Sequence, residues 1–118
     1  MIGLMSFGFK HGEPTEGEVV FDVRDLPNPF YIPELKDHTG LETCVRDYVM
    51  QFPESQERLL FLQKEAERLI QEGDTVSIAI GCTGGHHRSV TMVEELKEIL
   101  TDAGFPVSVI HRDIQKGM

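Results

Sequence analysis

Short apolar runs alternate with longer amphipathic stretches along the chain, and this alternation predicts the secondary structure. Runs rich in apolar and β-branched residues have the length of strands and lie at 2–9, 18–24, 75–81 and 107–111. Helices are expected between the second and third runs and before the last one, at 42–51, 53–72 and 89–102. The predicted order is therefore β-β-α-α-β-α-β, with a proline-rich ordered loop after the second strand.

The last strand–loop–helix–strand unit indicates the class of fold. Such a unit favours a parallel pair of strands joined by a right-handed crossover. We therefore expect an α/β fold: a small three-layer-like domain with about three helices on a mixed, mainly parallel four-stranded sheet. If the first two strands paired as a hairpin, the class would instead be α+β. The 118 residues suit a single domain over 1–118.

The loop between the third strand and the last helix carries most of the candidate chemistry. Its sequence is Cys-Thr-Gly-Gly-His-His-Arg-Ser, residues 82–89. Glycines let backbone N–H groups turn inward, and the start of a helix adds partial positive charge. Arg88 supplies a cation that suits phosphate oxygens, and Thr83 and Ser89 add hydroxyl donors. The loop predicts an anion site, with phosphate as the obvious ligand; the alternative is a tight turn that leaves Arg88 in solvent.

The same loop has the spacing Cys-x5-Arg-Ser, which resembles the phosphate loop of cysteine-dependent phosphatases. In that chemistry, a thiolate attacks phosphorus and an arginine holds the phosphate oxygens. Cys82 and Arg88 would be the catalytic pair. Gly81 replaces the histidine usual before the cysteine, and no acid loop can be assigned. A phosphatase is therefore the alternative function, and a structural Cys82 closing a strand is the simpler interpretation.

Composition and charge limit the other function classes. The net charge of −9 excludes a general electrostatic attraction for nucleic acid. Two cysteines cannot build a disulfide framework, so we expect a cytoplasmic protein with free thiols. The histidines lack the spacing of metal ligands, so no metal site is expected. No apolar run is long enough to span a bilayer, so no membrane partner is expected.

Several longer motifs, taken together and in order, resemble a known family. They are SFGFKHG (6–12), VFDVRDLPNPFYIPEL (20–35), TG (39–40), AIGCTGGHHRSV (79–90) and HRD (111–113). This combination resembles the C-terminal domain of the RapZ family of RNase adapter proteins, also called the YvcJ/YhbJ nucleotide-binding proteins. The resemblance covers essentially the whole chain.

The resemblance implies a non-enzymatic, ligand-sensing domain that resembles a phosphofructokinase subdomain and binds glucosamine-6-phosphate. It carries the sugar-phosphate contacts onto His11 and onto most of the glycine-rich loop. With the remaining loop residues included, the candidate ligand site is His11, Cys82, Thr83, Gly84, Gly85, His86, His87, Arg88 and Ser89. The ATP or GTP site of the family lies in an N-terminal P-loop domain. This sequence has no Gly-x4-Gly-Lys-Ser/Thr motif, so no cofactor is expected.

The resemblance also implies two macromolecular partners, a small regulatory RNA and an endoribonuclease. In the family, RNA contacts use a basic C-terminal tail. Here the tail keeps Arg112 and Lys116 but adds Asp113, so we expect these two basic residues to support only weak RNA binding. Useful RNA affinity would require several copies of the domain side by side, which favours a homo-oligomer.

Overall fold

The computed structural model describes residues 1–14 and 18–117 and confirms the α/β class. Its strands are β1 (Ile2–Gly8), β2 (Val19–Asp22), β3 (Val76–Cys82) and β4 (Val107–His111). Its helices are α1 (Thr43–Met50), α2 (Pro53–Glu72) and α3 (Arg88–Asp102), and short 3-10 turns cover Phe9–His11 and Pro29–Tyr31. The predicted elements all appear: α2 and β4 have the predicted bounds, and the ends of the others lie within two residues of the prediction.

The sheet has the strand order β2-β3-β1-β4, and every pairing in it is parallel. Ile2 pairs with Val76 on one side and with Val107 on the other, so β1 is a central strand. The expectation of a mixed sheet was therefore wrong, and so was the hairpin alternative, because β3 lies between β1 and β2. β1 and β3 are the two central strands, and their apolar sequences are typical of buried parallel strands.

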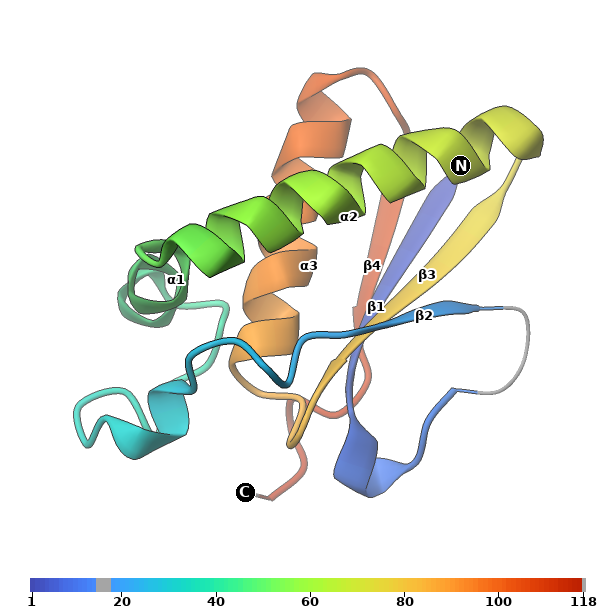
Figure 1. Ribbon diagram of the computed structural model, residues 1–118. Coiled ribbons are helices and arrows are strands. Elements are labelled where there is room, and N and C mark those ends of the chain that lie inside the picture. The colour runs from blue at the N-terminus through green and yellow to red at the C-terminus, as the bar shows by residue number, and fades with distance from the viewer. Residues whose placement is uncertain (15–17, 118) are drawn as a thin grey trace.

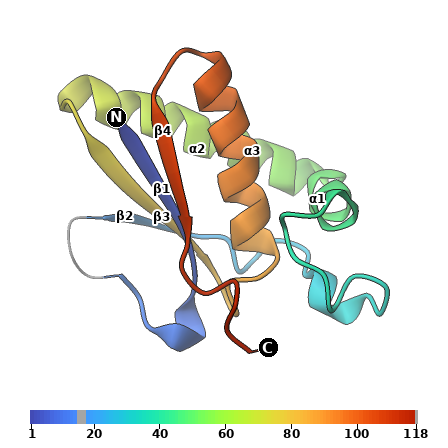
Figure 2. The ribbon, with the colours of Figure 1, turned by 180° about the vertical axis from the view of Figure 1, so that it is seen from behind.

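The helices of the described part lie on one face of the sheet, so the three-layer-like arrangement was also wrong (Figures 1 and 2). Helix α3 packs on β1, β3 and β4, α2 packs on β3 and α3, and α1 packs on the other two helices. The reason is topological. The steps from β2 to β3 and from β3 to β4 cross the sheet in the same direction, so right-handed crossovers put both helical connections on the same face.

The core lies between this helical layer and the sheet. Alternate residues of β1 and β3, such as Ile2, Leu4 and Ile78, point into it and are buried. The predicted apolar stripe of α2 is confirmed, with Leu62 and Ala66 fully buried at its centre. Each fully buried aliphatic side chain of this kind stabilises the fold by about 1.5–3 kcal/mol.

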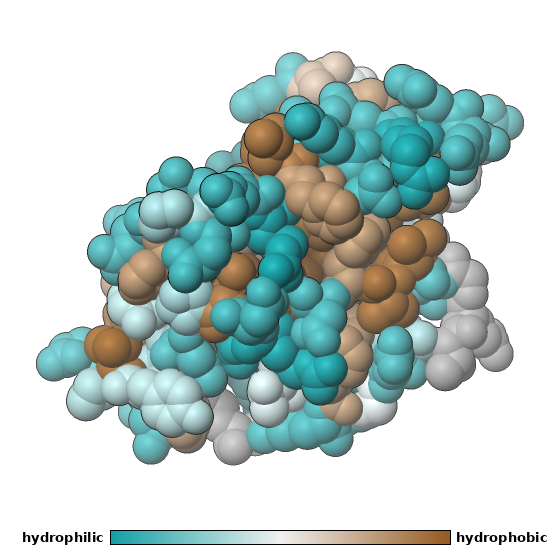
Figure 3. Space-filling model, in the orientation of Figure 1, coloured by the Kyte–Doolittle hydropathy of each residue, from teal (hydrophilic) through white to brown (hydrophobic). Residues whose placement is uncertain are grey.

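The surface over α2 and β2 is largely hydrophilic, with hydrophobic groups gathered where the helix lies over the edge of the sheet (Figure 3). Phe21 of β2 and Phe61 of α2 meet there edge to face, with ring centroids 5.9 Å apart. The helix-free face of the sheet is more open, and Ile110 is 58% exposed on it. The helical face therefore holds the core, and the carboxyl ends of β1 and β3 lead into the site described next.

Candidate functional site

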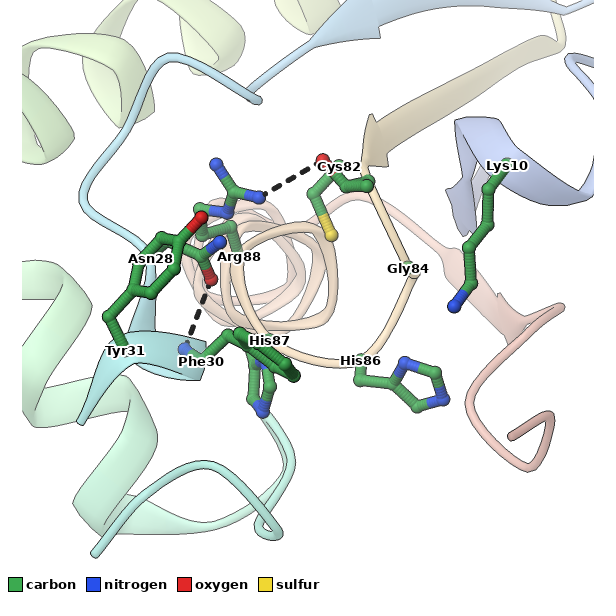
Figure 4. Close-up of a pocket in the computed structure, with 10 residues that line it drawn as sticks. Lys10, Asn28, Phe30, Tyr31, Cys82, Gly84, His86, His87 and Arg88 are labelled. Atoms are coloured by element: carbon green, nitrogen blue, oxygen red, sulfur yellow. Dashed lines mark hydrogen bonds between the residues drawn. The ribbon is translucent and has the colours of Figure 1, made fainter. Parts of the chain in front are cut away.

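A cavity of about 250 Å³ lies where β1 and β3 end and α3 begins (Figure 4). Two stretches of chain form most of its wall, the glycine-rich loop after β3 and the proline-rich loop after β2. The residues that line it are Lys10, Asn28, Phe30, Tyr31, Cys82, Thr83, Gly84, His86, His87 and Arg88. Its place at the carboxyl ends of parallel strands is the usual ligand position in α/β folds.

The glycines of the loop allow it to pack directly against the end of β1. A Cβ atom on Gly85 would lie 2.8 Å from the backbone nitrogen of Gly8, and Gly85 has a φ of +82°. A Cβ atom on Gly8 would lie 2.4 Å from the carbonyl carbon of Gly84. Only residues without a side chain fit this close approach of two backbones. The glycines therefore have a steric role: they let the loop pack against the end of β1 just before α3 begins.

Arg88 is buried, with 4% of its surface exposed, so the alternative that left it in solvent was wrong. One terminal nitrogen, Nη1, donates to the carbonyl oxygens of Arg24 and Leu26. The other, Nη2, lies 3.4 Å from the Thr83 hydroxyl oxygen, which accepts a weak hydrogen bond. The remaining nitrogen, Nε, is buried and has no partner.

The lack of a carboxylate partner sets Arg88 apart within the described residues. The other arginines each pair with at least one carboxylate: Arg24, Arg46, Arg58, Arg68 and Arg112. A buried cation without a counter-ion is costly, because its desolvation is only partly offset by neutral carbonyl groups. An anion bound beside Arg88 would supply the missing charge.

The two histidines of the loop hold neighbouring segments in place. His86 Nε2 lies 2.6 Å from the carbonyl oxygen of Lys116, and His87 Nε2 lies 3.1 Å from that of Lys36. Since a carbonyl oxygen only accepts, each Nε2 carries the proton. Burial lowers the pKa of His87 below its ordinary value, against its hydrogen bonds to backbone carbonyls and with help from electrostatic repulsion by its neighbours, including the Arg88 guanidinium. His87 is therefore a neutral imidazole at pH 7.

Lys10, rather than His11, reaches the cavity from the end of β1. The Lys10 backbone nitrogen donates to the carbonyl oxygen of Thr83 at 3.2 Å, and its side chain extends toward His86 (Figure 4). His11 does not line the cavity, and its Nε2 is buried without a hydrogen-bond partner. The 3-10 turn that follows β1 explains the difference, since it turns successive side chains in different directions.

Cys82 lies at the base of the cavity, with 2% of its surface exposed, and it belongs to the hydrophobic core. Its thiol donates to the Ser89 hydroxyl oxygen at 3.2 Å. Ser89 is fully buried, and neither Ser89 nor Gly85 lines the cavity. A reactive cysteine is normally at least partly exposed, so this environment favours a structural thiol.

The sequence prediction missed Asn28, Phe30 and Tyr31, which form the opposite wall. The Asn28 side-chain oxygen accepts a hydrogen bond from the Phe30 backbone nitrogen at 3.1 Å and so caps the turn Pro29–Tyr31. Tyr31 is 78% exposed. The signal in the sequence was the run of prolines around two aromatic residues, which indicates an ordered loop but not its position beside the glycine-rich loop.

The predicted RNA-binding residues do not line the cavity, and they share one carboxylate. Arg112 and Lys116 both form ion pairs with Asp113, which is fully buried. Asp113 also accepts a hydrogen bond from the Gly8 backbone nitrogen at 2.8 Å. Burial alone would raise the pKa of Asp113, but the hydrogen bonds from Arg112, Gly8 and Lys116 hold it well below its usual range. Asp113 is therefore charged, and it neutralises much of the basic character of the tail.

Residues 1–14 and 18–117 contain no group of three or more His, Cys, Asp or Glu side chains arranged to hold a metal ion. Among the same residues, no helix is both long enough and apolar enough to cross a membrane.

Comparison with known proteins finds relatives that share one kind of description and one family model that matches the chain. A nucleotide-binding protein of Limosilactobacillus reuteri is 49% identical over 120 residues, which cover 98% of this chain and 41% of the relative. Proteins with the same description from Caldicellulosiruptor saccharolyticus and Clostridium acetobutylicum are 47% and 46% identical, again over 98% of this chain and 41% of their own length. The chain thus spans about two fifths of these relatives. The family model of the RapZ C-terminal domain matches residues 1–115, and the chain belongs to this family.

Proposed function

We propose that this domain is a ligand sensor that binds a small sugar phosphate of the glucosamine-6-phosphate class in the cavity beside Arg88. The observation that carries the proposal is the buried guanidinium of Arg88, which has an unpartnered Nε and no carboxylate among the described residues. A phosphate group matches this need because guanidinium nitrogens and phosphate oxygens form strong, charge-assisted hydrogen bonds.

The rest of the cavity suits a phosphate as well. Arg88 is the first residue of α3, so the N-terminus of this helix faces the same space with its partial positive charge. Lys10 adds a second cation to the wall, and the Thr83 hydroxyl adds a donor. Three kinds of positive or donor group therefore converge on one cavity in a strongly acidic protein.

We propose further that the bound sugar phosphate regulates a longer protein of the RNase-adapter type. The family supports this regulatory role, and the relatives are more than twice the length of this chain. In this proposal the domain binds and does not catalyse. The buried Cys82 thiol and the hydrogen bonds that hold Arg88 to Arg24 and Leu26 favour binding over a phosphatase reaction.

Calorimetry on the wild-type protein and on Arg88→Gln tests the proposal, with glucosamine-6-phosphate and inorganic phosphate as ligands. Loss of a hydrogen-bonded charge pair costs about 1.5–3 kcal/mol. We therefore expect Arg88→Gln to bind both ligands about ten- to a hundred-fold more weakly.

The matched control is Arg68→Gln, because Arg68 is an exposed arginine on α2 whose ion pairs with Glu65 and Glu72 lie outside the cavity. It should bind as the wild type does. Thermal unfolding of each variant confirms that it is folded. Equal affinity of wild type and Arg88→Gln would refute the site, and steady release of phosphate from an aryl phosphate would favour the phosphatase instead.

A further inference from the structure

We propose that Tyr31 recognises the part of the ligand beyond the phosphate, by stacking its aromatic ring on the sugar ring of the bound sugar phosphate. This inference rests on the proposed function, since it presumes that the phosphate lies beside Arg88. It makes Tyr31 the specificity-determining residue of the site, which separates a phosphorylated sugar from free phosphate.

Tyr31 lies in the wall of the cavity that also contains Arg88. The close-up shows Tyr31 and Asn28 on one side of the cavity and Gly84 and Lys10 on the other, with Arg88 between them (Figure 4). A phosphate bound at Arg88 would therefore have an aromatic wall beside it. The groups that attract negative charge are Arg88 and the glycine-rich loop. The apolar surface comes from the opposite wall, which contains Phe30 and Tyr31.

The two aromatic residues of this wall leave much of their surface exposed. Tyr31 is 78% exposed and Phe30 is 38% exposed, although both are large aromatic residues beside a cavity. The ammonium of Lys36 lies over the Phe30 ring, 5.0 Å from its centroid. Inorganic phosphate has no apolar surface to place against such a wall. A sugar has one, because the C–H groups on one face of its ring form a flat apolar patch, and aromatic residues commonly line sites for ligands with apolar surface.

Local contacts order the turn that carries Tyr31. Pro29 is buried, the Asn28 side chain caps the turn, and the Ile32 backbone nitrogen donates to the Pro29 carbonyl oxygen at 2.9 Å. Phe30 and Tyr31 pack edge to face with centroids 5.7 Å apart. Arg88 holds the preceding residues of the same loop through the carbonyl oxygens of Arg24 and Leu26. The turn that carries the exposed ring is thus ordered before any ligand arrives, which lowers the entropy cost of binding.

Calorimetry with glucosamine-6-phosphate and with inorganic phosphate tests this role on wild type, Tyr31→Ala and Tyr31→Phe. An aromatic contact of this kind is expected to contribute about a two- to ten-fold change in affinity. Tyr31→Ala should therefore lose about that factor for glucosamine-6-phosphate and keep its affinity for inorganic phosphate. Tyr31→Phe, which retains the ring, should bind both ligands as the wild type does.

The control is Phe61→Ala, which removes a half-exposed aromatic side chain of α2 and should leave both affinities unchanged. If Tyr31→Ala binds glucosamine-6-phosphate as tightly as wild type, the stacking proposal is wrong and the phosphate site still stands. If wild type binds neither ligand, the proposed function itself fails. Tighter binding of adenosine monophosphate than of the sugar phosphate would overturn the assignment of a sugar as the stacked ring.

Discussion

Asp113 joins three segments that are far apart in the sequence. Its carboxylate accepts hydrogen bonds from the Gly8 backbone, from Arg112 and from Lys116, and its Cβ would lie 3.0 Å from a Cβ placed on Gly85. It therefore braces the end of β1 from behind, at the point where the glycine-rich loop packs against that strand. A single buried charge supports the shape of the candidate site without lining it.

We expect Asp113→Asn to be less stable than wild type by about 1–3 kcal/mol at pH 7, because it loses charge-assisted hydrogen bonds. The pKa of Asp113 is lowered in the folded state, whereas an unfolded Asp titrates at about 3.9. The stability that its charge provides is thus complete above about pH 4 and is lost as the pH falls further toward the folded-state pKa. Denaturant unfolding over a pH series measures this.

In that series, the gap in the free energy of unfolding between wild type and Asp113→Asn should shrink as the pH falls below about 4. Asp37→Asn, at an exposed acid, is the control and should remain close to wild type throughout. A difference in the free energy of unfolding that stays constant from pH 7 to pH 2 would mean that the charge of Asp113 does not stabilise the fold.

The limits of prediction from sequence are clearest at such residues. In the sequence, Asp113 stood out only as an acid in a basic tail, because its partner Gly8 lies 105 positions away. His11 was predicted for the site on its place after the first strand, yet the 3-10 turn brings Lys10 to the cavity. Side-chain direction in a turn depends on backbone angles that residue types alone do not specify.

At the level of elements, patterns within a few residues predicted the helices and strands. They did not predict which strands pair with one another. The stripe of α2, its start at Pro53 and the strand β3 followed from patterns within a few residues. The all-parallel order could not follow in the same way, because β1 and β3 are both apolar and each could have been paired with several neighbours. The right-handed crossover rule alone could not place the helices, because the face on which a connection lies depends on the strand order.

Two glycines with positive φ offer a matched test of the close packing between the glycine-rich loop and β1. Gly104, after α3, has a φ of +95° and free space around its missing side chain, whereas Gly85 has a φ of +82° and β1 directly beside it. Gly104→Ala should cost about 1–2 kcal/mol, for backbone strain alone. Gly85→Ala should cost more, because the added methyl group also collides with the Gly8 backbone.

Thermal or denaturant unfolding of both variants measures the difference. Gly85→Ala should also weaken the binding of inorganic phosphate, since the displaced loop contributes to the cavity, and Gly104→Ala should bind normally. Equal loss of stability in the two variants would show that the loop can move away from β1 at little cost.

At the scale of the whole molecule, charge governs the partners that the domain can attract. The net charge is −9, and the described arginines other than Arg88 are paired with carboxylates. Arg112 and Lys116 share the carboxylate of Asp113. The tail therefore offers little uncompensated positive charge to a phosphate backbone.

We expect the isolated domain to bind RNA weakly at physiological salt, with a shallow dependence on salt concentration. Each phosphate contact contributes a slope of about −0.9 on duplex and about −0.7 on single strands, so one or two contacts give a small total. Gel-shift assays over a salt series, paired with a sizing measurement, test this. Tight binding by a monomer would contradict it, whereas binding that appears only with oligomers would agree with linked weak sites.

The central place of β1 has a consequence for how the chain reaches its fold. β1 is made before either of its neighbours, and its first partner, β3, follows only after the whole of α1 and α2. During synthesis both edges of this apolar strand therefore remain unpaired until the second half of the domain has been made. Sheets built from such distant pairings form slowly and are prone to aggregate before they close. A chain that stopped after α2 would hold β1 and β2 without β3, the strand that joins them.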